Sequence, residues 1–249
     1  MDNRFIIITP FYNVENWINL CVNSVYKQDY KNYIHYLVDD ISTDKSAEKI
    51  EKIIKDKDNF HLIKNQVKKY ALQNVYDTLK DNNINDDDIV VILDGDDWLA
   101  SSEALQRINE EYEKTDCLMT YGSYVEYPSL LRGKFSKRIP DHIIQQQSYR
   151  KNEWMSSQLR TFRYKLWKNI DKEDFINEQT DKFIKAAWDL AFVFPMLEMC
   201  GHRAHYIEDI LYMYNRTNPL NEDKVDHSLQ LSEERQVRSR NVYKLQENI

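Results

Sequence analysis

The sequence of 249 residues is poor in glycine and in cysteine. Its four glycines are few for a fold that turns often between strands and helices. Its three cysteines, Cys21, Cys117 and Cys200, are an odd number at wide spacing. This pattern supports neither a disulfide framework nor pairs of metal ligands, so we expect buried thiols and a reducing compartment.

Long apolar runs are missing too. The segment FIIITPF (residues 5–11) is interrupted by Pro10, and LAFVFPMLEMC (residues 190–200) is interrupted by Pro195 and Glu198. Neither run is long enough to span a bilayer, and the N-terminus lacks the charged and apolar regions of a signal peptide. We therefore expect a soluble, cytoplasmic protein with no transmembrane segment.

A surplus of positive charge is also absent. The chain has 34 Lys and Arg residues against 41 Asp and Glu residues, which gives a net charge of -7. Binding to nucleic acid or to an anionic membrane needs an excess of basic residues on some face. The composition argues against nonspecific binding of this kind, so any phosphate group would be bound locally.

The sequence does contain alternating apolar and amphipathic segments, and its 42% hydrophobic content can form a substantial core. The patterns predict strands over residues 4–9, 33–38, 60–64 and 88–93. They predict helices over residues 13–28, 42–57 and 68–80, the first with Asn13 as its N-cap. This alternation predicts an α/β fold with a mainly parallel, doubly wound sheet and helices on both faces.

After residue 100 the alternation weakens and the chain is expected to be mostly helical. The patterns predict helices over residues 102–114, 152–170, 181–201 and 228–245, with strands over 117–127 and 205–215. Residues 127–150 resemble a loop, and Pro195 should kink its helix. The charged tail from Asn221 is expected to pack on the domain as a solvated helix.

Polar clusters follow three of the predicted strands, at residues 9–13, 39–44 and 94–97. In a doubly wound sheet, ligands bind at the carboxyl ends of the strands, so these clusters should meet. Within the second cluster, Asp44 is expected to cap the following helix, whereas Asp39 lies directly at the strand end. A carboxylate there could accept hydrogen bonds from a ligand.

The third cluster is DGDD, in which Asp94 and Asp96 should point to one side and Asp97 to the other. Two converging carboxylates repel each other unless a cation separates them. Mg²⁺ and Mn²⁺ take one or two carboxylates and complete their shell with water and phosphate oxygens. Gly95 would allow close approach of the backbone. The alternative is an acidic turn that caps the helix beginning near Ser101.

Three segments together resemble the inverting glycosyltransferases of family 2, which have the GT-A fold. They are IIITPFYNVENWINLCVNSVYKQDY (residues 6–30), YLVDDISTDKSAEKI (36–50) and VVILDGDDWL (90–99). Their order and spacing over about the first 100 residues match the nucleotide-sugar-binding part of that family. The glycines common in the second motif are replaced here by Ile41 and Lys45, so that loop is expected to differ in conformation.

The resemblance implies a role for each matching residue. Around the nucleotide base and its neighbourhood it places Thr9, Pro10, Tyr12, Asp39 and Lys69, with Asp39 accepting a hydrogen bond from the base, commonly uracil. It also implies roles for the DGDD carboxylates. Asp94 would contact the ribose or the metal shell, Asp96 would bind Mn²⁺ or Mg²⁺, and Asp97 would support it or touch the sugar.

The second half resembles the family more loosely. Asp189, flanked by Trp188 and Leu190, matches the general base, although an ordinary helix carboxylate is the alternative. Arg160 or Arg163 could face the leaving diphosphate or form surface ion pairs. His227 could be a late metal ligand or a plain exposed side chain. Residues 127–150 match nothing that we can interpret.

The resemblance thus implies a metal-dependent enzyme that transfers a sugar from a nucleotide-sugar, with UDP as the expected carrier, to an acceptor hydroxyl with inversion. Residues 1–115 would bind the donor, residues 116–220 would bind the acceptor and carry the base, and residues 221–249 would form a charged helical tail. The acceptor could be a glycan, a lipid-linked sugar or a protein. A catalytically silent binding module is the alternative. A nucleotidyltransferase is disfavoured because TPFYNVEN has no glycine-rich phosphate loop.

Overall fold

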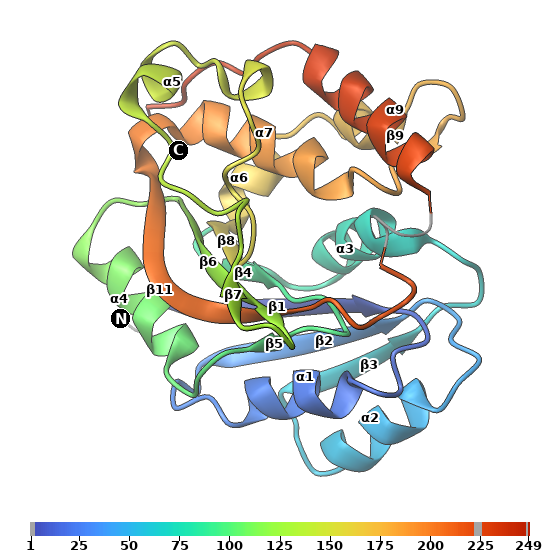
Figure 1. Ribbon diagram of the computed structural model, residues 1–249. Coiled ribbons are helices and arrows are strands. Elements are labelled where there is room, and N and C mark those ends of the chain that lie inside the picture. The colour runs from blue at the N-terminus through green and yellow to red at the C-terminus, as the bar shows by residue number, and fades with distance from the viewer. Residues whose placement is uncertain (1–2, 222–225, 248) are drawn as a thin grey trace.

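The computed structural model describes residues 3–221, 226–247 and 249, and its centre is a nine-stranded sheet (Figure 1). Eight strands follow the order β3-β2-β1-β4-β8-β6-β11-β5, and β7 pairs with β6. Their bounds are β1 Phe5–Phe11, β2 Tyr33–Asp39, β3 Phe60–Lys64, β4 Ile89–Ile92, β5 Trp98–Leu99, β6 Met119–Tyr127, β7 Leu131–Arg132, β8 Arg160–Arg163 and β11 Ala204–Asn215. The pairs formed among β1 to β4 are all parallel, and β6 is parallel to β11, so the sheet is mainly parallel as predicted.

Strand β1 continues through Pro10 to Phe11, two residues beyond its predicted end. Pro10 faces Val38 of β2, whereas the register with β4 ends at the pair of Ile8 and Ile92. Beyond Ile8, therefore, one side of β1 has no ladder partner. The missing N–H of Pro10 can lie on that side without loss of a ladder hydrogen bond.

The prediction of a helix over residues 152–170 was wrong. The chain there forms β8 and then the short helix α6 (Tyr164–Lys168). Strand β8 lies antiparallel between β4 and β6, and it buries Thr161 and Phe162 completely. β-Branched and aromatic residues such as these pack well in a β-sheet. The neighbouring strands β4 and β6 provide hydrogen-bond partners for the backbone of β8.

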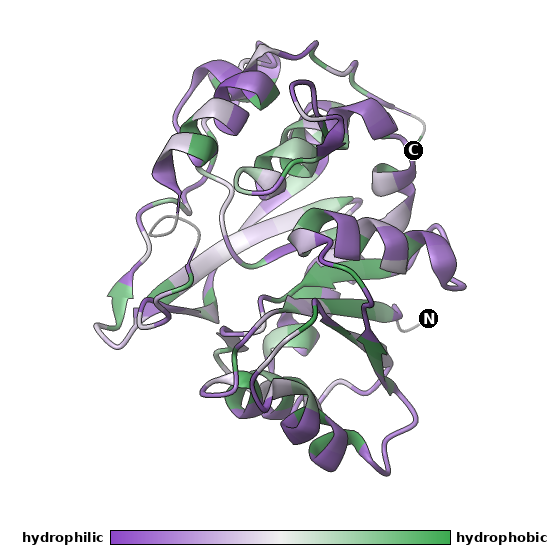
Figure 2. Cartoon of the chain, turned by 90° about the vertical axis from the view of Figure 1, so that its right-hand side faces the viewer, coloured by the Kyte–Doolittle hydropathy of each residue, from purple (hydrophilic) through white to green (hydrophobic). Residues whose placement is uncertain are grey.

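Helices cover both faces of the sheet (Figure 1). One core contains residues of α1 (Ile18–Tyr26), α2 (Ser46–Ile54) and α4 (Ala104–Lys114). The other contains residues of α3 (Tyr70–Asp81), α6 and α7 (Trp188–Cys200). In Figure 2 the central strands are hydrophobic and the outer helical surfaces hydrophilic. Each strand of the first half contributes alternate residues to the two cores, such as Ile6 to one and Ile7 to the other.

The remaining elements complete the second half. They are α5 (Asp141–Gln145), the 3₁₀ turns Tyr149–Lys151, Lys172–Phe175 and Gly201–Arg203, the hairpin of β9 (Ile176–Asn177) and β10 (Lys182–Phe183), and α9 (His227–Ser239). The segment predicted as a loop thus holds β7 and α5. The predicted tail helix ends at Ser239, and its buried Glu233 and Val237 pack against the domain.

Two predicted helix starts differ from the observed ones by five residues or more. Helix α1 begins at Ile18, and Asn13 is no cap: its φ is 52° and its Oδ1 accepts a hydrogen bond from the Thr43 N–H at 2.8 Å. Asn13 therefore ties two loops together. The stretch from residue 181 first forms β10, so α7 begins only at Trp188.

Helix α7 is apolar along most of its 13 residues and continues through Pro195. It is buried between the sheet and the outer elements, since twelve of its residues are buried. Across the described residues, no helix has both the length and the apolar character that a membrane crossing requires. The three cysteines are buried free thiols, as expected.

Candidate active site

A cleft of about 1050 Å³ opens at the carboxyl edge of the parallel strands. The loops after β1 and β4 form one side of it, and the start of α7 and one face of α9 form the other. The polar clusters that follow β1 and β4 therefore both reach this cleft, as the sheet topology predicted.

The DGDD turn is held in place by contacts with distant segments. Asp97 is only 1% exposed, and its carboxylate accepts hydrogen bonds from the Tyr212 hydroxyl at 2.6 Å and from the Asn215 N–H at 2.7 Å. A Cβ on Gly95 would lie 2.5 Å from the Cβ of Phe11, so only glycine fits there. Asp97 thus fastens β11 to the turn, and Gly95 lets the turn approach β1.

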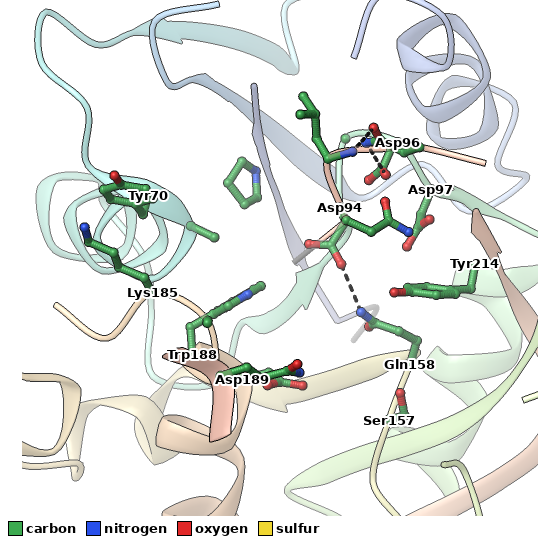
Figure 3. Close-up of a pocket in the computed structure, with 18 of the residues that line it drawn as sticks. Tyr70, Asp94, Asp96, Asp97, Ser157, Gln158, Lys185, Trp188, Asp189 and Tyr214 are labelled. Carbon is green, nitrogen blue, oxygen red and sulfur yellow. Dashed lines mark hydrogen bonds between the residues drawn. The ribbon is translucent and has the colours of Figure 1, made fainter. Parts of the chain in front are cut away.

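Asp94 and Asp96 lie on the cleft side of this turn (Figure 3). Asp94 Oδ2 accepts a hydrogen bond from Gln158 Nε2 at 3.0 Å, and Asp96 Oδ2 accepts one from Asn218 Nδ2 at 2.7 Å. Burial, together with the negative charge of Asp96, raises the pKa of Asp94 to about 7. The two carboxylates are therefore close enough to repel each other, which a cation between them would relieve.

Asp189 lies in the first turn of α7 and faces the same space as Asp94 (Figure 3). Its Oδ2 accepts a hydrogen bond from Nη1 of Arg160 at 2.6 Å, and its Oδ1 accepts one from the Leu190 N–H at 3.0 Å. The positive charge of Arg160 lowers the pKa of Asp94, and the negative charge of Asp189 raises it. Residues from β4, β8 and α7 therefore form one electrostatic cluster.

Arg160 is 2% exposed and lines the cleft from the first position of β8. Among the described residues its Nε has no hydrogen-bond partner, although the atom is buried. A buried guanidinium N–H without a partner is costly unless a ligand satisfies it. Arg163, by contrast, donates to Asn3 Oδ1 and to the Asp87 carbonyl and is not among the residues that line the cleft.

Glu233 of α9, which sequence reasoning missed, holds the residues that lead into α7. Its buried carboxylate accepts hydrogen bonds from the N–H groups of Ala186 at 2.7 Å and of Lys185 at 3.0 Å. These residues immediately precede the helix that carries Asp189. Nothing near Glu233 in the sequence signals this contact, which spans 47 residues to Ala186.

At the end of the cleft next to the loops after β1 and β2, Pro10 and Tyr12 line the surface. The Lys68 ammonium lies 3.0 Å from the centre of the Tyr12 ring and 3.4 Å from Asp40. Lys69 instead pairs with Asp77 at 2.8 Å and does not line the cleft. Thr9 is fully buried and hydrogen-bonded to His35 Nε2 at 2.8 Å, beneath the surface of the site.

The two aspartates at the end of β2 have different positions. Asp39 accepts a hydrogen bond from the Ser42 N–H at 2.8 Å and is not among the residues that line the cleft. Asp40 lines the cleft and accepts hydrogen bonds from the N–H groups of Lys69 and Tyr70. Burial raises the pKa of Asp40, but these hydrogen bonds outweigh it and hold the pKa below its usual value.

His227 is exposed at the start of α9. Within residues 3–221, 226–247 and 249, no three or more His, Cys, Asp or Glu side chains are grouped as they would be in an all-protein metal site. Asp44 is not the cap of α2, because Lys45 holds that position; it lies one residue earlier and accepts hydrogen bonds from the N–H and the hydroxyl of Ser46, the first residue of the helix. No helix begins at Ser101, because α4 starts at Ala104.

Comparison with known proteins places these features in a family. The family model described as Glycosyl transferase family 2 matches residues 6–181. The chain is 30% identical over 176 residues to Glycosyltransferase GlyA of Streptococcus pneumoniae serotype 4, which covers 68% of this chain and 25% of that protein. It is 34% identical over 122 residues to an uncharacterized glycosyltransferase of Haemophilus influenzae, covering 47% of this chain and 46% of the relative.

Solved structures share the fold. TarS 1-349 of S. aureus in complex with UDP-GlcNAc matches with a TM-score of 0.69 at 17% identity, over 94% of this chain and 65% of that one. The mannosyltransferase PcManGT of Pyrobaculum calidifontis, in complex with GDP-Man and Mn²⁺, matches with a TM-score of 0.65 at 16% identity, over 98% and 66% of the two chains. The expected GT-A fold is confirmed, and the chain spans a quarter to just under half of its curated relatives. The chain belongs to glycosyltransferase family 2.

Proposed function

We propose that this glycosyltransferase transfers a sugar from a nucleoside diphosphate sugar, with UDP as the carrier, to an acceptor hydroxyl with inversion of configuration. The observation that carries the proposal is that Asp94, Asp96 and Asp189 meet in one cleft although they come from two separate elements. This arrangement supports the proposal, because a turn that binds the donor and a group that accepts the proton would have to share one space. The donors named for the related structures, UDP-GlcNAc and GDP-Man, are consistent with this chemistry.

The donor set fits a hard divalent cation. Asp96, with Asp94 beside it, offers carboxylate oxygens whose mutual repulsion a Mn²⁺ or Mg²⁺ ion would relieve. Such ions use one or two carboxylates and leave their other positions to diphosphate oxygens, which agrees with the sparse protein ligands at this turn. When bound, the ion would neutralise the charge of the leaving diphosphate.

We assign the general base to Asp189. A carboxylate has about four lone-pair positions, so hydrogen bonds to Arg160 and to the Leu190 N–H leave acceptor capacity for a hydroxyl proton. The acceptor hydroxyl would lose its proton to Asp189 as its oxygen attacks the anomeric carbon and the bond to the diphosphate breaks. Arg160 orients the base and has one unsatisfied N–H, which a diphosphate oxygen could accept.

The end of the cleft that binds the nucleotide base would consist of Pro10 and Tyr12, with Thr9 as support beneath them. Of the basic side chains, we propose Lys68 as the one that contacts the nucleotide and assign Lys69 a role through its backbone N–H to Asp40. Asp40, with Asp39 behind it, would shape this end of the cleft. We propose that residues 1–115 bind the donor and that residues 116–220 bind the acceptor and carry the general base. Helix α9 of the tail lines the cleft as well.

The experiment is a thermal-shift panel of UDP-, GDP- and dTDP-sugars with and without Mn²⁺, followed by transfer and donor-hydrolysis assays. We expect UDP-sugars with Mn²⁺ to raise the melting temperature of the protein. Asp96→Asn should lose the Mn²⁺-dependent part of this shift, and Asp189→Asn should keep it while transfer falls by about 10²–10⁴-fold. Asp86→Asn, at an exposed ion pair with Lys168, is the matched control and should change neither readout.

Two results would overturn the proposal. Full transfer activity in Asp189→Asn would remove the assignment of the base. Donor binding with neither transfer nor hydrolysis in the unaltered protein would instead support a silent binding module. The anomeric configuration of the product, followed by NMR, tests inversion separately.

A further inference from the structure

An exposed apolar cluster lies on the hairpin formed by the end of β6 and β7. Of its side chains, Leu130 is 63% exposed and Leu131 is 68% exposed, and Tyr127 and Phe135 are each more than one-third exposed. We call residues 127–138 the hairpin segment. Figure 2 shows it projecting from the body of the molecule, at the left of that view. Scattered exposed leucines are ordinary, but two neighbouring leucines at the tip of a projection, with Tyr127 and Phe135 near its base, are not.

The backbone of the hairpin segment is built to hold these side chains outward. Leu130 has a φ of 58°, a conformation that favours glycine or asparagine, and its N–H donates to the Glu126 carbonyl at 2.7 Å. Gly133 packs against the Tyr124 ring so closely that a Cβ there would overlap it, at 1.9 Å. A leucine is therefore kept at a strained, solvent-exposed position of a firmly anchored turn, where neither folding nor solubility would favour it.

The hairpin segment also carries a local positive charge. It contains Arg132, Lys134, Lys137 and Arg138 and no acidic residue, in a chain whose net charge is -7. Arg132 lies 3.7 Å from Glu208, and Lys137 lies 3.2 Å from Glu153. For the part of the chain that the structure describes, no carboxylate lies within ion-pair distance of Lys134 or Arg138. Among the described residues, the segment thus keeps two basic side chains, those of Lys134 and Arg138, without an acidic partner, while Arg132 and Lys137 are each paired.

The hairpin segment lies beside the cleft. Phe135 lines the cleft, as does Glu126 just before the segment. Ser157, which also lines the cleft, is bonded directly to the segment, since its N–H donates to the Phe135 carbonyl at 3.2 Å. Whatever the hairpin segment binds would therefore lie next to the acceptor side.

We propose that the hairpin segment docks on an anionic membrane surface, with Leu130 and Leu131 inserted among the lipids. Leucines with flanking aromatic and basic side chains are the combination that partitions into a lipid–water interface. The two leucine side chains at this tip offer much less than the area of about 800 Å² per partner that a stable protein interface uses. Acidic residues elsewhere oppose this docking little, because charges beyond about 8 Å are screened at physiological salt.

Together with the proposed function, this docking predicts that the acceptor is lipid-linked. A cleft whose acceptor side adjoins the membrane would receive a hydroxyl carried at the lipid headgroup. This second step rests on the proposed glycosyl transfer, whereas the docking itself does not. The two are therefore tested separately.

The test is co-sedimentation with vesicles of phosphatidylcholine alone and of phosphatidylcholine mixed with phosphatidylglycerol. The whole chain should bind the mixed vesicles and release them at high salt. Leu130→Ser/Leu131→Ser should weaken binding at least about tenfold, and Lys134→Gln/Arg138→Gln should weaken only the binding to anionic vesicles. Leu20→Ser/Val242→Ser removes two exposed apolar side chains elsewhere and should bind as the unaltered protein does.

Donor hydrolysis with a soluble nucleotide-sugar separates this proposal from the proposed function, since the hairpin variants should keep it. No binding of the unaltered protein to mixed vesicles, or equal binding by the Leu130→Ser/Leu131→Ser variant, would overturn the docking. Self-association that this variant abolishes would also overturn it, because the apolar tip would then serve a second copy of the chain.

Discussion

Replacement of Glu233 by alanine should be strongly destabilising and should disturb the start of α7. The carboxylate is 2% exposed and accepts hydrogen bonds from the N–H groups of Lys185 and Ala186 and from the side chain of Asn177 at 3.0 Å. A hydrogen bond to a charged group contributes about 1.5–3 kcal/mol, and contributions that share one acceptor are not additive. We expect Glu233→Ala to lower the free energy of unfolding by about 3–5 kcal/mol, because it also leaves buried N–H groups unpaired.

Glu233→Gln removes the negative charge of this side chain and keeps nearly the same shape. The amide keeps one acceptor oxygen of similar position, but its NH₂ group replaces an oxygen that accepts hydrogen bonds and would face a donor. The loss of unfolding free energy should therefore be about 1–3 kcal/mol, and the protein should remain folded. In this variant we expect kcat for transfer to fall while the UDP-sugar affinity stays the same, since the N–H groups precede the base and not the donor turn.

The assay is urea denaturation followed by tryptophan fluorescence, with the m-value as a check that the transition is unchanged. Arg235→Gln, on the exposed face of the same helix, is the control and should stay within about 0.5 kcal/mol of the unaltered protein. A loss below about 1 kcal/mol in Glu233→Ala at unchanged m would refute the idea that α9 fixes the approach to α7 through this carboxylate.

Three further predictions follow from buried groups of the site. Burial lowers the pKa of His35 from 6.5 to about 3; between these values only the unfolded chain gains the proton, so stability falls by about 1.4 kcal/mol per unit as pH drops. His35→Gln should remove this part of the slope in denaturation measured at several pH values; equal slopes would contradict it. Gly95→Ala should cost about 1–3 kcal/mol and weaken donor binding, because its Cβ would meet that of Phe11; unchanged stability and donor affinity would show that the turn adapts. Asp97→Ala should destabilise the protein by about 3 kcal/mol or more, since the Tyr212 hydroxyl and the Asn215 N–H lose their acceptor; a loss of activity at full stability would instead place Asp97 at the substrate.

The first half of the fold was predictable because β1, β2 and β4 are buried on both faces and the helices have one apolar stripe. Strand β3 matched its predicted range, and β4 differed only at its ends. Strand β8 could not be found in the same way. It has four residues, and its place depends on two strands that come from elsewhere in the chain. A short segment of mixed pattern fits a helix equally well until its neighbours are known.

At the cleft, sequence reasoning pointed to clusters that do line it, but not always to the member of each cluster that lines it. Lys68 and Asp40 line the cleft, whereas their neighbours Lys69 and Asp39 do not. Asp39 ends strand β2, and adjacent residues of an extended chain point to opposite sides, so an error of one position there reverses which carboxylate faces the cleft. The turn after β2 sets this choice, and it is here that Ile41 adopts a φ of 61° where the family often has glycine.

The DGDD turn shows why a motif that is continuous in sequence still depends on the whole chain. Asp94 bonds to Gln158 just before β8, Asp96 bonds to Asn218 after β11, and Asp97 bonds to β11 itself. Each of the three carboxylates thus accepts a hydrogen bond from a later segment of the chain, between 64 and 122 residues away. The first half of the chain supplies the charges, and the second half sets their spacing. Because the proposed base on α7 is likewise set by Arg160 and by α9, neither half can form the site alone.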